Sequence, residues 1–337
     1  MKKRIRIEDV ALKAGISTAT VSRYINRSGV VSEKNAQKIQ AVIEDLKYVP
    51  NVAAKILASQ KTMTLGLIFP SLSSTFFSSL LHGIETRAQK DDYTLLIHST
   101  ETLTKGIKTR RVIGEQNTDG IIGFSDSLSD EELIRLTDIG FPVVLIHRSS
   151  PTFLNIPSVT IENKSGVNKL ISHLIEEHKY KDIVFLRGPE GHEDAYWREA
   201  GYRKALLEHG IPYNSDLVEY GDFNMVQSRL AVKRLLDRNI KFDAIFAGDD
   251  DAASGSMMAL REAGLNIPGD VAVVGFDDQS IAVHLSPSLT TIRSPIEEVG
   301  FQATDKLIHL IEGHSVETET ILTTELIIRL SCGCNNS

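Results

Sequence analysis

The chain has 337 residues, of which 42% are hydrophobic and 24% are charged, and its formal net charge is −7. This composition is typical of a globular protein and excludes a disordered or fibrous chain. Because the length exceeds what one hydrophobic core usually supports, we expect two or three domains.

Targeting signals are absent from the sequence. No apolar run reaches the length of a transmembrane helix. The basic residues at the N-terminus lead directly to Glu8 and Asp9, without the apolar region of a signal peptide. We therefore expect a cytoplasmic protein with no membrane partner.

The net charge is distributed unevenly along the chain. Residues 1–62 contain 12 Lys and Arg against 5 Asp and Glu, a balance of +7, whereas the remainder carries −14. A basic head on an acidic body favours nucleic-acid contact confined to the head. A solvated basic tail is the alternative, but the basic residues are interleaved with a helical apolar pattern, which disfavours it.

The first 50 residues predict a helix-turn-helix. Helical apolar patterns flank Gly15, which can adopt the positive φ that a tight corner between helices needs. Ser17 or Thr18 can cap the second helix, which in this motif enters the major groove of DNA. A third helix of about 14 residues begins after Ser32 as its cap. The apolar pattern of the first two helices consists of Val10, Ala14, Ile16, Val21 and Ile25, and the expected buried stripe of the third helix consists of Ala36, Ile39, Val42, Ile43 and Leu46.

A short linker follows the third helix. Pro50 ends this helix, because the residue before a proline avoids the helical conformation. Residues 52–59 have helical propensity, but so short a helix is not stable alone. Residues 60–62 then lead into a body with a different periodicity.

From Met63 onward, strand-like apolar runs alternate with amphipathic helical runs, which predicts parallel sheets with helices on both faces. The expected strands are Leu65–Phe69, Tyr93–Ser99, Gly120–Phe124, Pro142–His147, Asp182–Leu186, Ala244–Ala247 and Val271–Phe276. The expected helices are Phe76–Lys90, Glu131–Ile139, Lys164–Glu177, Arg198–His209, Met225–Arg238, Ala252–Ala263 and Glu297–Glu312, with residues 104–117 as a further helix by position. We expect two lobes, with a ligand cleft at the carboxyl ends of the strands.

The motifs of nucleotide-binding and hydrolytic enzymes do not occur in the sequence. Walker A, G-x-G-x-x-G, G-x-S-x-G and H-E-x-x-H patterns are all missing, so nothing favours an enzyme. Cys332 and Cys334 cannot form a disulfide framework, and a C-x-C pair alone is a weak zinc signal. We therefore interpret them as part of a solvated, reduced tail, and expect no metal and no cofactor.

Carboxylates gather where two expected strands end. Asp249–Asp251 follow one strand, and Asp277–Asp278 follow another. At such positions carboxylates can accept hydrogen bonds from the vicinal hydroxyls of a sugar. The alternatives are capping of the next helix and a divalent metal held by several carboxylates. We expect one aspartate of each group to face a ligand and its neighbour to be structural.

Two aromatic groups are further candidates. Trp197 and Arg198, at the expected start of a helix, could stack on and clamp a ligand. Alternatively, Trp197 lies in the core and Arg198 forms a surface ion pair. Phe76 and Phe77 are adjacent, so they cannot both face the core from one helix, and one could face the cleft. Packing of both at the helix end is the alternative.

The ordered set of motifs resembles the LacI/GalR-type bacterial transcription regulators over essentially the whole chain. The head matches in Ile7-Glu8-Asp9-Val10-Ala11, Ala14-Gly15-Ile16-Ser17, Thr20-Val21-Ser22-Arg23, Asn26 and Tyr48-Val49-Pro50-Asn51. The body matches in Asp119-Gly120-Ile121-Ile122, Glu162-Asn163, Gly166, Arg198, Gly201-Tyr202, Val273-Val274-Gly275-Phe276-Asp277-Asp278 and Leu289-Thr290-Thr291-Ile292. The resemblance implies an all-α N-terminal helix-turn-helix DNA-binding domain with a hinge helix, followed by an α/β two-lobed periplasmic-binding-protein-like effector domain.

The resemblance also implies domain boundaries. The DNA-binding domain would span residues 1–49, the hinge helix and linker 50–62, and the effector-binding and dimerisation domain 63–337. Within the last, the N-lobe would comprise about 63–161 and 293–322, and the C-lobe about 162–292 and 323–331.

A sequence-specific repressor is implied, which binds double-stranded palindromic operator DNA as a homodimer. The implied DNA-binding residues are Arg6, Ser17, Thr18, Ala19, Ser22, Arg23, Asn26, Asn51, Ala54 and Leu57. Arg23 can donate two hydrogen bonds to a guanine edge, and Leu57 would wedge into the minor groove. The hinge helix would form only with its partner and DNA present.

The implied effector is a sugar or sugar derivative bound between the lobes. The implied effector-binding residues are Phe76, Phe77, His147, Trp197, Arg198, Asp249 and Asp277. His147 stands where the family usually has Asp, and Asp249 where Asn is common, so the identity of the effector stays open. Regulation by a co-repressor or a partner protein is an alternative, as is a cytoplasmic solute-binding protein, which the basic head disfavours.

Overall fold

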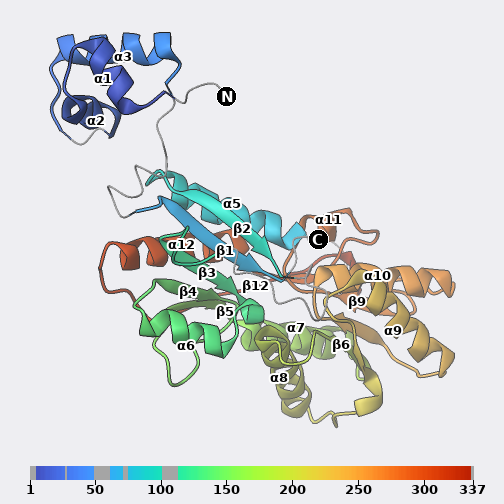
Figure 1. Cartoon of the computed structure of the whole chain (residues 1–337). Helices are drawn as coiled ribbons and strands as arrows, with labels where there is room; N and C mark the ends of the chain where they lie inside the picture. Colours follow the sequence, from blue (N-terminus) through green and yellow to red (C-terminus); the bar gives the residue numbers. More distant parts are fainter. Residues whose placement is uncertain (1–4, 27–28, 49–60, 71–74, 101–112, 335–337) are drawn as a thin grey trace. The chain divides into compact units, whose positions relative to one another are not determined.

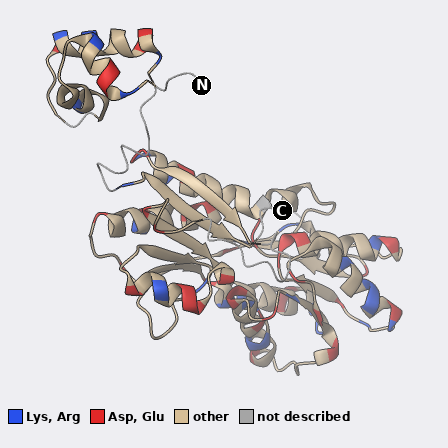
Figure 2. Ribbon diagram, viewed as in Figure 1, with Lys and Arg blue, Asp and Glu red and all other residues tan. Residues whose placement is uncertain are grey.

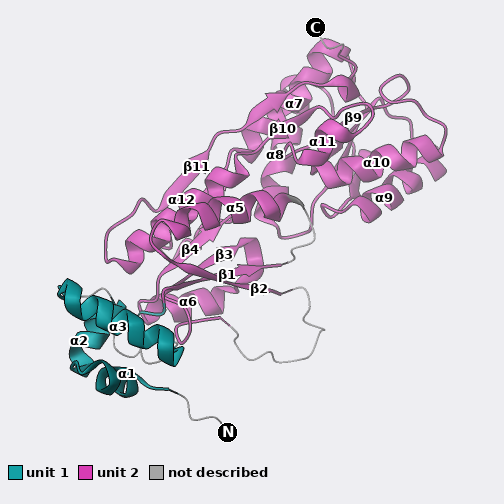
Figure 3. Cartoon of the chain, turned by 90° about the horizontal axis from the view of Figure 1, so that it is seen from above, with its two compact units in different colours: residues 1–62 teal, residues 63–337 magenta. Residues whose placement is uncertain are grey.

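The computed structural model describes residues 5–26, 29–48, 61–70, 75–100 and 113–334. The chain divides into two compact units, residues 1–62 and residues 63–337 (Figures 1 and 3). None of the helices in these described ranges combines the length and apolar character that crossing a lipid bilayer requires.

The first unit holds three helices, α1 (Ile7–Ala14), α2 (Thr18–Asn26) and α3 (Glu33–Leu46). Gly15 follows α1 with a φ of 67°, as predicted for the corner. Ser17 caps α2, because its Oγ accepts a hydrogen bond of 3.2 Å from the backbone N–H of Thr20. Ser32 precedes α3 as expected, but its side chain makes no capping hydrogen bond, so that part of the prediction is wrong.

The core of the first unit draws on all three helices. Val10, Ala11, Val21 and Ile39 are buried. The other expected core positions of α3 are only half-buried, because a unit of about 60 residues has little interior.

The N-lobe of the second unit is built on a six-stranded parallel sheet in the order β11-β5-β4-β3-β1-β2. Its strands are β1 (Thr64–Phe69), β2 (Thr94–Ser99), β3 (Gly120–Phe124), β4 (Val143–Ile146), β5 (Ser158–Ile161) and β11 (Glu319–Leu322). Its helices are α5 (Thr75–Gln89), α6 (Asp130–Asp138), α12 (Ile296–Ile311) and the 3-10 turn η1 (Ser125–Ser127). Every residue of β3, β4 and β5 is buried, because apolar clusters cover both faces of the sheet.

Helices α5 and α12 approach each other backbone to backbone. A Cβ atom at Gly83 would lie 1.9 Å from the carbonyl oxygen of Glu297, and one at Gly300 would lie 2.3 Å from that of Leu80. Only glycine fits at either contact, so the middle of α5 packs closely against α12.

The C-lobe is built on a four-stranded parallel sheet in the order β7-β6-β8-β9. Its strands are β6 (Ile183–Arg187), β7 (Val218–Tyr220), β8 (Ala244–Ala247) and β9 (Ala272–Val274). Its helices are α7 (Asn163–His178), α8 (Glu193–Glu208), α9 (Met225–Asp237), α10 (Asp250–Glu262), α11 (Ser280–His284) and the 3-10 turn η2 (Ser215–Leu217).

The chain passes between the two lobes three times: after β5, after β10 (Thr291–Arg293), and between β11 and β12 (Glu325–Ile327). Strands β10 and β12 pair antiparallel, with Ile292 opposite Leu326. A last 3-10 turn, η3 (Leu330–Cys332), packs on the C-lobe, where the Ser331 hydroxyl donates to the carbonyl of Val273 at 2.5 Å.

The parallel two-lobed fold confirms the prediction, and each expected strand is present. Helix α8 begins at Glu193, five residues before its expected start at Arg198. The short elements β5, β7, β10, β11, β12 and α11 are not predicted from the sequence, because polar residues interrupt the apolar pattern of each. Of the expected helix over residues 104–117, the described part (113–117) contains bends and turns, and the rest lies outside the described residues.

Candidate functional site

Helix α2 presents one polar face to solvent. Thr18, Ala19, Arg23 and Asn26 are exposed, and Ser22 is half-buried. Their spacing of three to four residues puts them on the same face. Val21, on the opposite face, is buried in the core. The predicted base-reading residues are therefore available together.

The remaining predicted DNA contacts divide into two groups. Arg6 is exposed immediately before α1, and its backbone N–H donates to the Asp9 carboxylate at 2.8 Å. Asn51, Ala54 and Leu57 lie outside the described residues.

Arg198 is the centre of a buried polar cluster in the C-lobe. Its side chain is 3% exposed and donates to the Asn163 Oδ1 at 2.9 Å and to the Gly248 carbonyl at 2.6 Å. A third contact of 3.4 Å reaches the Asp277 Oδ1. The guanidinium carbon also lies 3.8 Å from the ring centroid of Phe276. Arg198 therefore lies within α8 rather than at the start of a helix. The alternative of a surface ion pair is also wrong, because the side chain is buried.

His147 and Asp194 join the two lobes beside this cluster. His147 follows β4 of the N-lobe with a φ of 54°, and its Nδ1 lies 2.7 Å from the Asp194 Oδ2 in α8. Asn163 also donates to Asp194, at 2.8 Å. Burial opposes ionisation of Asp194, but the charge of His147 and its hydrogen bond hold the pKa of this carboxyl well below its ordinary value.

The other ring nitrogen of His147, Nε2, is buried and has no hydrogen-bond partner among the described residues. The Phe76 ring lies 5.4 Å from the imidazole, and the Phe124 ring lies 5.2 Å from it. A buried polar atom beside two aromatic rings suits a ligand that presents a hydroxyl and an apolar ring face.

Phe76 and Phe77 have different surroundings. Phe77 is buried in the core, with its ring centroid 5.3 Å from that of Phe69. Phe76 is half-buried, next to His147. The expectation that one of the pair faces the cleft therefore fits Phe76, whereas Phe77 supports it from behind.

Two of the three aspartates after β8, Asp249 and Asp250, are buried. The Asp249 Oδ1 accepts the backbone N–H of Ala252 at 2.8 Å and caps α10. Burial and the nearby charge of Asp277 raise the pKa of Asp249 to about 8. Asp250 accepts from the Thr291 hydroxyl at 2.6 Å and from the Gln279 backbone at 2.7 Å, so Asp250 is structural.

The aspartates after β9 divide in the same way. Asp277 accepts a hydrogen bond of 3.0 Å from the Ser294 hydroxyl and faces Arg198. Asp278 instead forms ion pairs with Arg293 at 2.8 Å and Arg329 at 2.6 Å. The groups of side chains in the described ranges that could hold a metal ion include none of these aspartates, which argues against a metal held by them.

Trp197 lies on the outside of α8. Its side chain is 39% exposed, and its Nε1 donates to Glu193 at 3.2 Å. The alternative that placed Trp197 in the core is therefore wrong. Glu193 in turn accepts from the backbone and the hydroxyl of Ser149, so Trp197 adjoins the second link between the lobes.

A cavity of about 650 Å³ reaches the cluster at Asp277 and Phe76, whereas Arg198, His147 and Asp249 are not among its lining residues. Phe76 and Ser79 line it from α5, and Asp277 and Ser294 line it from the C-lobe end and the second crossing. Its size is that of a pocket for a small molecule.

Several residues of the cluster escaped the sequence-based prediction. Asp194 contacts His147, and Asn163 contacts both Asp194 and Arg198. The partners are 31 to 47 positions apart in the sequence, so no local pattern indicates these contacts. Phe223 packs 5.1 Å from the Arg198 guanidinium, and a Cβ atom at Gly188 would lie 2.2 Å from its ring. Gly188 and Gly248, which follow β6 and β8, leave room for the Phe223 ring. These two glycines are the only feature of the sequence that could have indicated this packing.

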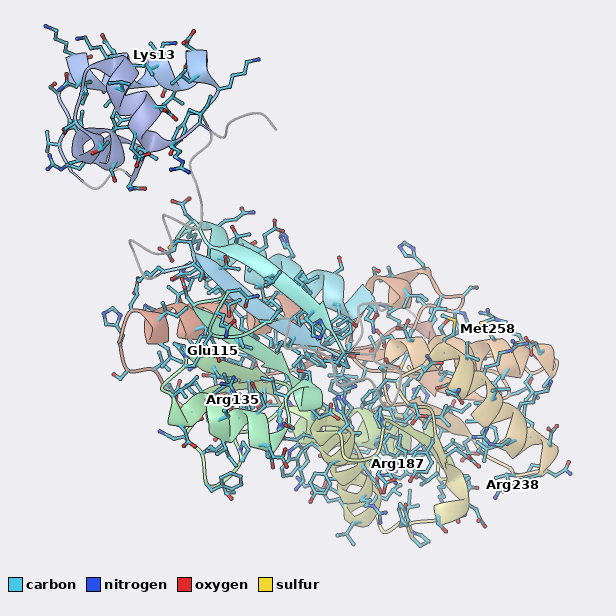
Figure 4. All side chains as sticks on the ribbon, viewed as in Figure 1. Lys13, Glu115, Arg135, Arg187, Arg238 and Met258 are labelled. Atoms are coloured by element: carbon cyan, nitrogen blue, oxygen red, sulfur yellow. The ribbon has the colours of Figure 1, made fainter. Side chains whose placement is uncertain are left out.

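Charged residues on the outer helices are more exposed than those of the buried cluster. Figure 2 shows acidic and basic residues spread over the outer helices of both lobes. Arg135, labelled in Figure 4, donates to both carboxylate oxygens of Glu115 at 3.2 and 3.1 Å, with partly exposed side chains. Arg135 also binds Glu132 of its own helix, so its charge is paired within the N-lobe and marks no separate site.

Comparison with known families gives two matches. Residues 6–51 match the family described as bacterial regulatory proteins, lacI family. Residues 171–332 match the periplasmic binding protein-like domain. The first match covers the three helices of the head, and the second covers most of the C-lobe and the crossing strands.

Whole-length relatives agree with these matches. The chain is 33% identical over 333 residues to the probable HTH-type transcriptional repressor ExuR of Bacillus subtilis (strain 168), covering 96% of this chain and 97% of that protein. It is similar to the structure of the Lac repressor dimer bound to operator and the anti-inducer ONPF, with a TM-score of 0.84 and 26% identity, covering 98% of this chain and 99% of that one. A complex of the transcriptional regulator CelR with cellobiose has a TM-score of 0.71 and 29% identity, covering 97% and 100%.

Proposed function

Because this chain belongs to the LacI family of bacterial transcriptional regulators, we propose that it represses transcription as a cytoplasmic homodimer on palindromic operator DNA, under the control of a carbohydrate bound between its lobes. Sequence-specific DNA binding follows from the family. The finer statements rest on the residues of α2 and of the buried cluster.

The observation that carries the proposal is the cluster around Arg198. Its groups come from both lobes: His147 and Phe76 from the N-lobe, and Asp194, Arg198 and Asp277 from the C-lobe. A polyhydroxylated ligand can exchange hydrogen bonds with the carboxylates and the imidazole while its ring stacks on Phe76. The relative that was solved with cellobiose has the same fold.

Control of DNA binding follows from the same arrangement. A ligand that contacts both lobes favours the lobe orientation in which all its contacts are made. Because the N-lobe follows directly on the linker to the head, a shift of the lobes alters how two heads are presented to an operator. The effector and the operator are thereby coupled through a population shift.

The test uses the full chain. Selection from random duplexes identifies the preferred operator, and fluorescence anisotropy measures its affinity at several salt concentrations. We expect a palindrome and a steep fall of affinity with salt, because several phosphates are neutralised. Equal affinity for all sequences at physiological salt would contradict the proposal.

Effector candidates are then screened by thermal unfolding. A sugar that binds raises the melting temperature and changes operator affinity in the same concentration range. A fall in affinity identifies an inducer and a rise identifies a co-repressor. If sugars bind without altering operator affinity, carbohydrate control is wrong while DNA binding stands.

A further inference from the structure

Four metal-binding side chains converge away from the cleft. His173 and His178 belong to the last two turns of α7, and Cys332 and Cys334 lie at the C-terminal end of the described chain. One ligand atom from each residue lies within 4.8 Å of all the others. None of these residues belongs to the cluster around Arg198.

The distances match tetrahedral coordination. The Cys334 Sγ lies 3.6 Å from the His173 Nε2 and 3.4 Å from the His178 Nε2. In a tetrahedral zinc site, with a Zn–S bond of about 2.3 Å and a Zn–N bond of about 2.0–2.1 Å, sulfur and nitrogen ligands are about 3.5 Å apart. The side chains are therefore spaced for an ion between them.

The local backbone holds the two cysteines in place. Cys332 is fully buried, and the preceding Ser331 accepts the backbone N–H of Thr290 at 2.8 Å. Gly333 has a φ of 108°, and a Cβ atom there would lie 3.2 Å from both the His178 ring and the Tyr180 hydroxyl. The glycine lets the chain turn so that Cys334 returns to α7. The expectation of a solvated tail is thus wrong for Cys332, which lies in the core.

We propose that His173, His178, Cys332 and Cys334 form a structural site for one zinc-like divalent cation. Two imidazoles and two thiolates are the donor set of closed structural zinc sites. Binding releases the thiol protons and leaves no open position for a substrate. A bound ion would connect the segment after β12 to the end of α7. It would thereby stabilise the packing of the third crossing segment on the C-lobe.

The full chain, prepared without an affinity tag, tests the site. The reduced protein is stripped with a chelator, reloaded with Zn²⁺ or Co²⁺, and analysed for metal content. We expect one ion per chain. The chain contains only two cysteines, so a thiolate-to-cobalt charge-transfer band can arise only from this site.

Matched variants locate the site. Cys334→Ser and His173→Gln each remove one ligand at a partly exposed position, and metal affinity should fall by more than about 100-fold. His309→Gln is the control, because it alters the other candidate group (His309, Glu312 and His314), which is more exposed. Circular dichroism checks that each variant is folded.

Each of the following results would overturn the proposal. The reduced wild-type chain could bind no stoichiometric metal, the two ligand variants could keep their metal while folded, or His309→Gln could lose it to the same extent. Recovery of only a Cys332–Cys334 disulfide, with no metal bound after reduction and reloading, would equally count against it.

Discussion

The His147 Nδ1 lies 2.7 Å from the Asp194 Oδ2, and this fully buried contact connects the end of β4 in the N-lobe to the first turn of α8 in the C-lobe. Asn163 holds the other oxygen of Asp194 at 2.8 Å. The two lobes therefore meet through a hydrogen-bonded polar pair beside Arg198, and an effector bound as we propose would contact this pair.

Asp194→Asn should destabilise the protein by about 1–3 kcal/mol at pH 7, because the imidazole loses an ionised partner. The pKa of Asp194 is depressed in the folded state, so its contribution is present above about pH 4 and is lost as the pH falls further. Urea unfolding at pH 7 and at pH 3.5 measures both effects. The difference between wild type and variant should shrink at the lower pH, and a constant difference would contradict the assigned role.

Asp249→Asn should stabilise the protein increasingly from about pH 4 to about pH 8. The folded state raises the pKa of Asp249 to about 8, so it binds a proton that the unfolded chain releases, and wild-type stability falls across this range. The amide oxygen can still accept the Ala252 N–H and cap α10. Thermal unfolding across this pH range measures the effect, and a difference between wild type and variant that stays constant with pH would contradict it.

Arg198→Ala should abolish the response to effector while specific DNA binding persists. Because removal of a buried cation also costs about 3–5 kcal/mol, Arg198→Lys is the companion variant: it keeps the charge but loses the fork of donors. Arg203→Ala, on the exposed side of α8, is the control. Operator affinity with and without effector is the measurement, and retained regulation in both Arg198 variants would remove Arg198 from the effector site.

Arg23→Ala should weaken binding to the preferred operator by about 1–3 kcal/mol and relax selectivity at one base pair. Lys13→Ala is the control within the head, because Lys13 belongs to α1 and pairs with Asp45 of α3. Anisotropy titrations against operators altered at each position separate the two effects. Equal loss on every sequence would assign Arg23 to phosphate contact instead.

The sequence predicted those structural features that depend on residues close together in the chain. Gly15 and Ser17 act within one turn of chain, so the corner and the cap of α2 were recognisable from local chemistry. The strand ends that carry Asp249 and Asp277 were recognisable because an apolar run precedes each of them.

Long-range partners were not predictable in the same way. Cys334 meets His173 across 161 positions, and no local pattern relates them. Arg198 was placed at a helix start because the apolar pattern of α8 is weak: the helix buries Asp194 and Arg198 themselves. The packing of α5 against α12 determines whether Phe76 or Phe77 faces His147. This packing cannot be predicted from the sequence alone.

The threading of the chain has a consequence for how the protein can be divided. A single cut after Thr62 separates the two compact units. No single cut separates the lobes, because the N-lobe sheet takes its edge strand from β11, and the C-lobe core takes Cys332 from the segment after β12. Heads can therefore be exchanged between such regulators by one recombination event, whereas the two lobes must be inherited and synthesised together.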